Sequence, residues 1–73
     1  MLLSNLIYSD FDINCEYEVY YCENEDIVWN DGGIKIIDST SQHGPLDKYL
    51  NMKVKYITIY NSKLIIEIRK KEI

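Results

Sequence analysis

Residues 54–70 read VKYITIYNSKLIIEIRK, two runs of β-branched and aromatic residues on either side of Asn61-Ser62. Such runs favour β-strands, and a two-residue turn between them predicts a hairpin of strands 54–60 and 63–70. If the turn pairs Tyr60 with Lys63, alternation places the predicted core on one face: Ile57, Ile59, Leu64, Ile66 and Ile68. The opposite face is mixed and carries Val54, Tyr56, Thr58, Tyr60, Lys63, Ile65, Glu67 and Arg69.

A second group of strands is predicted upstream of this hairpin. From Cys15 to Tyr21, apolar or aromatic residues alternate with polar ones, which is typical of a half-buried antiparallel strand. Residues 23–26 then form a polar turn that leads into a short strand over Ile27–Trp29. Residues 30–33 read NDGG and tolerate positive φ, so they predict a tight hairpin with a returning strand over Ile34–Ile37.

Helical segments are short in this sequence. Residues 1–7 place leucine and isoleucine at helical spacing, and residues 46–50 follow Pro45 at a position where a helical turn can begin. Residues 38–45 form the longest loop. We expect one domain, residues 1–73, of mainly β (α+β) class: a small antiparallel sheet of four to five strands with a short N-terminal helix and one helical turn before the C-terminal hairpin.

Length and cysteine usage restrict how such a chain is stabilised. A 73-residue domain buries only about 60% of its unfolded surface, and a thin core favours a homo-oligomer. In one strand, Cys15 and Cys22 would lie roughly 23 Å apart, beyond the reach of a disulfide. Reduced thiols and the absence of any 18-residue apolar run predict a cytoplasmic protein with no membrane segment.

The sequence carries no recognisable catalytic or metal-binding constellation. Asp10–Asn14 matches the start of a calcium loop, but Cys15 stands where glycine is required and Tyr21 where a bidentate glutamate is required. His43 is the single histidine, and no neighbouring group is placed to orient its ring. A zinc site would need four ligands at short paired spacings, and the sequence does not offer them. We therefore expect neither an enzyme nor a metal or cofactor site.

Two surfaces remain as candidates for binding, and the first is acidic. Complementary charge speeds the encounter with a basic partner, and Tyr and Trp are enriched at binding hot spots. The alternative is a solvated sheet face whose charges only prevent edge aggregation. The predicted partner-binding residues are Glu16, Glu18, Tyr20, Glu25, Asp26 and Trp29.

The second candidate surface is the mixed face of the C-terminal hairpin. Aromatic side chains among cations on a sheet are typical of single-stranded nucleic-acid binding. The net charge of −4 argues against this use, and the alternative is a second small core or a dimer face. The residues of this alternative nucleic-acid site are Tyr56, Tyr60, Lys63 and Arg69.

In size, in its Ile, Lys, Asn and Tyr bias, and in layout, the chain resembles the small accessory proteins of phages and mobile elements in low-GC bacteria. The layout has LLSNLI at residues 2–7, strands after it, and VKYITI at residues 54–59. The resemblance implies stoichiometric binding, including inhibition of host defence nucleases. Our leading interpretation is a non-enzymatic binder of a host macromolecule, such as an inhibitor of a nuclease or an anti-CRISPR-like protein. A single-stranded nucleic-acid binder and a structural homo-oligomer subunit are the alternatives.

Overall fold

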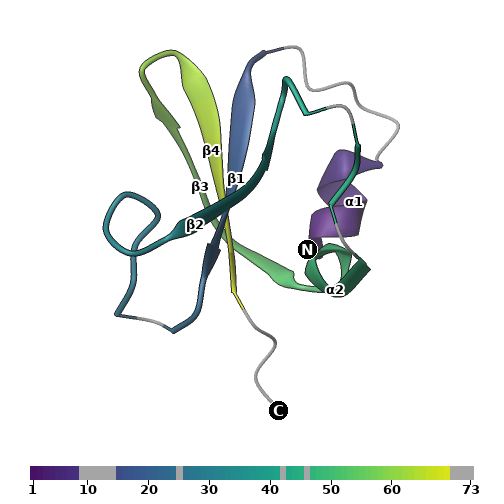
Figure 1. The fold of residues 1–73 in the computed structure, drawn as a ribbon, viewed down its shortest axis with the longest axis horizontal. Coiled ribbons are helices and arrows are strands. Elements are labelled where there is room, and N and C mark those ends of the chain that lie inside the picture. The colour runs from purple at the N-terminus through teal and green to yellow at the C-terminus, as the bar shows by residue number, and fades with distance from the viewer. Residues whose placement is uncertain (9–14, 25, 42, 46, 70–73) are drawn as a thin grey trace.

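The computed structural model describes residues 1–8, 15–24, 26–41, 43–45 and 47–69. Within these ranges the elements in chain order are α1 (Leu3–Ile7), β1 (Tyr17–Cys22), β2 (Ile34–Asp38), α2 (Asp47–Leu50), β3 (Lys53–Tyr60) and β4 (Lys63–Arg69). The strands form one sheet in the order β2-β1-β4-β3 (Figure 1). The chain is a small α+β domain, which confirms the fold class expected from the sequence.

Both helices lie on the same side of the sheet (Figure 1). The core on this side combines Leu3 of α1 with strand residues, and each member of it is at most 5% exposed: Leu3, Val19, Ile37, Ile66 and Ile68. The N-terminus is joined to β3 as well, because the Leu3 amide donates to the carbonyl oxygen of Met52 at 2.9 Å. We call this side of the sheet the helix face.

The sheet is mixed, because β1 pairs with β2 in antiparallel fashion and with β4 in parallel fashion. The prediction of an antiparallel sheet is therefore wrong for the pairing of β1 with β4. The β3–β4 hairpin inserts β4 between β1 and β3, so β4 becomes a central strand. Its run Leu64-Ile65-Ile66 is the continuous apolar pattern of a strand that is buried on both faces.

The register of the C-terminal hairpin agrees with the prediction. Tyr60 pairs with Lys63, and Asn61 and Ser62 have φ values of 51° and 63°. Positive φ at both central residues is the geometry of a type I′ turn, which matches the twist of the flanking strands.

The predicted core of this hairpin is only partly correct. Ile66 and Ile68 are fully buried, whereas Ile57 is 40% and Ile59 is 73% exposed. Both exposed residues belong to β3, the outermost strand, and the helices do not extend over them. Val54 was placed on the opposite face, but a register shift between Val54 and Tyr56 turns it toward the core. A bulge of this kind reverses the alternation and leaves no mark in the sequence.

The expected short strand over Ile27–Trp29 is absent. Val28 forms only isolated bridges to Asp31 and Gly32, and β2 pairs directly with β1. The sheet therefore has four strands in the described ranges, and the described residues of the segment 23–33 form a loop. Neither α1 nor α2, the helices of the described part of the chain, is long and apolar enough to cross a membrane.

Candidate functional site

The loop of residues 23–33 packs against the face of the sheet opposite the helices (Figure 1). Its anchor is the Arg69 guanidinium, which donates to the carbonyl oxygens of Asn24 and Ile27, the latter at 3.0 Å. Arg69 also pairs with Glu67 at 2.6 Å, and the Glu67 side chain is only 4% exposed. We call this side of the sheet the loop face.

The return of the loop requires a glycine. The amides of Asp31 and Gly33 both donate to the Val28 carbonyl oxygen, at 3.0 and 3.1 Å. A Cβ on Gly33 would lie 2.7 Å from the Cα of Trp29, closer than real Cβ contacts occur. Glycine thus permits the close backbone approach that directs Trp29 onto the sheet.

Three aromatic rings from three separate segments meet on the loop face. The ring centroid of Trp29 lies 5.4 Å from that of Tyr20 on β1 and 5.3 Å from that of Tyr60 on β3. The first pair is tilted and the second is edge-on, and both arrangements suit aromatic quadrupoles. On the same face, Ile65 is 1% exposed. We call these three rings the aromatic triad.

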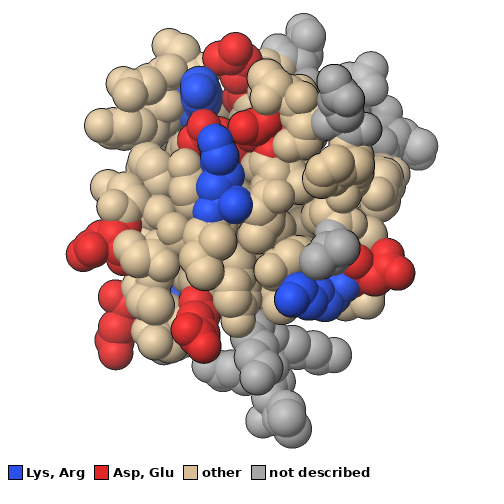
Figure 2. Space-filling model, in the orientation of Figure 1, with Lys and Arg blue, Asp and Glu red and all other residues tan. Residues whose placement is uncertain are grey.

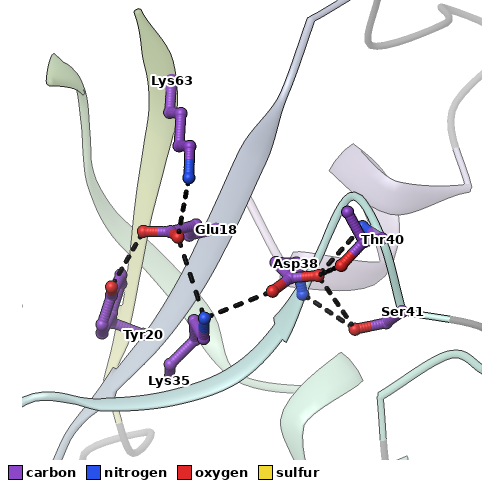
Figure 3. Close-up of polar contacts among 7 residues, drawn as sticks. All are labelled: Glu18, Tyr20, Lys35, Asp38, Thr40, Ser41 and Lys63. Carbon is purple, nitrogen blue, oxygen red and sulfur yellow. Dashed lines mark hydrogen bonds and ion pairs between the residues drawn. The ribbon is translucent and has the colours of Figure 1, made fainter. Parts of the chain in front are cut away.

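Beside the triad, Glu18 is the centre of a polar network (Figure 3). Its carboxylate accepts from the Tyr20 hydroxyl at 2.9 Å and pairs with Lys63 at 3.5 Å and Lys35 at 3.8 Å. Burial, followed by the adjacent Glu18 carboxylate, raises the pKa of Tyr20 to about 12. Two cations thus offset the charge of Glu18. This carboxylate stabilises the loop face and adds little to any negative patch.

The network continues to Asp38 at the end of β2 (Figure 3). The Thr40 hydroxyl donates to the Asp38 carboxylate at 2.6 Å, the Thr40 amide donates at 2.9 Å, and Lys35 lies 3.2 Å away. The hydroxyl of Thr40 first, then its amide and Lys35, lower the pKa of Asp38 to about 2. These contacts close the turn that follows β2.

Acid should therefore destabilise the fold through Asp38. Because its folded pKa is below its unfolded value, the stability it provides is complete above about pH 4 and is lost as the pH falls toward about 2. Urea unfolding of the wild type and of Asp38→Asn should be compared between pH 5 and pH 2, roughly the range of the shift. The wild type should lose more stability than the variant over this interval; equal losses would contradict the assignment.

The predicted acidic residues do not form one patch. Asp26 is exposed on the 23–33 loop, Glu16 is exposed just before β1, and Glu25 lies outside the described residues. The Leu64 amide donates to the Glu16 carbonyl oxygen, which places Glu16 at the hairpin end of β1, away from the loop. Two further acids of the loop, Glu23 and Asp31, are exposed as well. Figure 2 shows acidic side chains along the edge of the molecule that the loop occupies in Figure 1.

The residues of the alternative nucleic-acid site likewise do not form one binding surface. Tyr56 and Tyr60 are 50% and 54% exposed on the loop face. Lys63 is paired with Glu18, and the Arg69 side chain is 14% exposed and directed to Glu67 and the loop carbonyls. Both cations predicted to contact phosphate are thus engaged within the protein.

The remaining candidates are placed as isolated groups. His43 is exposed, and its Nδ1 lies 3.2 Å from the Gly44 carbonyl oxygen. It borders an open groove of about 420 Å³ between β2 and α2, lined mainly by apolar residues including Ile34, Ile36, Pro45 and Tyr49. Cys15 is exposed and Cys22 is buried; neither forms a disulfide, as predicted, and burial raises the pKa of the Cys22 thiol.

Within the described ranges, no group of three or more His, Cys, Asp or Glu side chains could hold a metal ion. The segment that matches the start of a calcium loop, Asp10–Asn14, falls outside the described ranges.

Fold and site together define a small α+β domain with a mixed four-stranded sheet, one face covered by helices and the other by a loop that carries aromatic and acidic side chains. Comparison with protein-family models, curated proteins and solved structures found no match to this chain.

Proposed function

We propose that this chain is a non-enzymatic binding protein that holds a basic protein partner with the exposed part of the 23–33 loop and the aromatic triad. The observation that carries the proposal is the convergence of Trp29, Tyr20 and Tyr60, together with the exposed carboxylates of the loop that holds Trp29. Tyr60 is 54% exposed and Val28 is 44% exposed, so this part of the protein offers apolar contact area to solvent. We call it the loop surface.

The chemistry of the loop surface suits arginine-bearing partners. A guanidinium can stack on the face of Trp or Tyr while a neighbouring carboxylate receives its N–H groups. Glu23, Asp26 and Asp31 are exposed acids on the loop. Desolvated aromatic anchors within a polar rim are the arrangement that concentrates binding energy in protein interfaces. Basic, arginine-rich surfaces are common on proteins that handle nucleic acids, so the form we propose is an inhibitor or regulator of a nuclease or defence complex.

Charge reversal on the loop should abolish binding. We compare Glu23→Lys/Asp26→Lys with Glu16→Lys/Asp47→Lys, whose residues are exposed outside the loop. Each reversal adds 2 to the net charge of −4, so both double variants have a net charge of 0. In pulldown from a bacterial lysate, the wild type and the Glu16/Asp47 variant should retain the same basic protein. The loop variant should retain at most about 10% of it, because a loss of about 1.4 kcal/mol of binding free energy weakens the affinity about tenfold.

A purified probe removes the dependence on the lysate. Trp29 is the single tryptophan of the chain, so its fluorescence reports on the loop surface alone. Titration with a deca-arginine peptide should change the Trp29 emission in the wild type, and the change should disappear in the loop variant. Equal responses of the two double variants would sink the proposal. Binding of a single-stranded oligonucleotide that is lost on Tyr60→Ala would favour the nucleic-acid alternative instead.

A further inference from the structure

The outer edge of β3 is covered over one half and bare over the other. β3 is an edge strand. Its first residues are covered by the N-terminus, because the Val54 amide donates to the Met1 carbonyl oxygen at 2.8 Å and Leu2 bridges to Lys53. In the part of the chain that the structure describes, no backbone outside the sheet bonds to residues 56–60. Alternate amides and carbonyls of this segment therefore face solvent.

The bare half also lacks the features that protect edge strands. Charge, proline and bulges normally prevent edge pairing. In β3 the register shift and both lysines, Lys53 and Lys55, fall in or next to the covered half. The opposite edge, β2, is only five residues long and includes Lys35 and Asp38. By contrast, residues 56–60 carry no charge and expose large side chains, with Ile59 at 73% and Tyr60 at 54%.

The bare segment is palindromic: residues 56–60 read Tyr-Ile-Thr-Ile-Tyr. An antiparallel pair centred on Thr58 would place Tyr56 opposite the partner's Tyr60, and Ile57 opposite the partner's Ile59. Aromatic and β-branched pairs are the cross-strand combinations that stabilise sheets. No like charges meet within these five pairs.

We propose that residues 56–60 pair with the same residues of a second copy in antiparallel register about Thr58, which joins two sheets into one of eight strands. The register follows from the limits of the bare edge, since the bulge at Lys55 closes one end and the Asn61-Ser62 turn closes the other. It places the isoleucines of both copies together on the helix face and the tyrosines together on the loop face. The second copy thus covers Ile57 and Ile59, which the helices leave exposed.

The area available limits the strength of this contact. With about 200 Å² for a fully exposed large side chain, the four exposed residues offer roughly 400 Å² on each copy. The total of roughly 800 Å² is below the roughly 1,200–2,000 Å² of stable interfaces, so association is reversible. Edge hydrogen bonds add to this small apolar contact, and we place the dissociation constant at about 0.1 to 1 mM.

Sedimentation equilibrium of the full chain from about 10 μM to about 1 mM tests the dimer. The mass of the wild type should rise from 8.7 kDa toward twice that value. Ile59→Lys should weaken association at least tenfold, because it places a charge in the pairing edge. Ile34→Lys, a matched change at a 60% exposed isoleucine on the other edge strand, should leave association unchanged. A wild type that stays monomeric, or equal effects of the two lysines, would overturn the proposal.

The register is tested independently by cross-linking. In a Cys15→Ser background, Thr58→Cys would face its own copy at a Cα separation of about 4.5–5.5 Å, within disulfide range. Mild oxidation should give a covalent dimer, and Asn61→Cys in the same hairpin should give much less. Equal yields would refute the register, and this result remains decisive if Ile59→Lys fails to fold.

Discussion

Replacing Arg69 with methionine is expected to lower the free energy of unfolding by about 3–5 kcal/mol. The substitution leaves Glu67, with a side chain only 4% exposed, without its cation. It also removes the donors that hold the carbonyl oxygens of Asn24 and Ile27. A domain of this size is stable by only about 4–11 kcal/mol, so much of its stability would be lost.

Urea unfolding followed by circular dichroism measures this loss, and Trp29 fluorescence follows the loop separately. Lys63→Met is the control, because it removes an ion pair whose lysine is 41% exposed and should cost at most about 1 kcal/mol. Adding Glu67→Gln to Arg69→Met should restore part of the stability by removing the buried charge. If Arg69→Met lowers the free energy of unfolding no more than Lys63→Met does, the Arg69–Glu67 ion pair does not stabilise the fold as described.

The second large effect is expected at Ile66. Truncation of this fully buried residue to alanine should cost about 2–5 kcal/mol, because a cavity opens among Leu3, Val19 and Ile68. Ile59→Ala, on the same predicted face of the same hairpin, should change stability by at most about 0.5 kcal/mol because Ile59 is 73% exposed.

Both isoleucine variants should be measured near 10 μM, where the proposed dimer dissociates. Equal costs at the two positions would mean that the helices and the sheet pack differently from the structure described. A large cost at Ile66 alone would support the division of the hairpin into a buried and an exposed strand.

Local patterns in the sequence were sufficient for most of the secondary structure. The alternation from Cys15 to Tyr21, the Asn61-Ser62 turn and the pairing of Tyr60 with Lys63 all depend on residues close in the chain. The alternating strand forms over Tyr17–Cys22 rather than from Cys15, which is exposed, and the turn and the pairing are as predicted. The predicted strand over Ile27–Trp29 is wrong, because its apolar residues lie in a loop. The anchor of that loop, Arg69, lies more than forty residues away in the sequence.

For the candidate surfaces, residue type alone was less informative. Glu18 was predicted to contact a partner, yet Lys35 and Lys63 from two other strands offset its charge. Trp29 and Tyr60 were assigned to separate surfaces, and the fold brings their rings to 5.3 Å. No periodicity within one segment predicts which side chains of distant strands become neighbours.

The sequence by itself determined the α+β class and the tight C-terminal hairpin, because propensity, alternation and turn chemistry are local. Only the tertiary structure decided the strand order. That order buries β4 on both faces and leaves β3 at the edge with Ile57 and Ile59 exposed. The run at residues 54–70 thus holds both the most buried strand and the barest edge, since burial depends on which strands become neighbours and the sequence pattern of one strand does not record its neighbours.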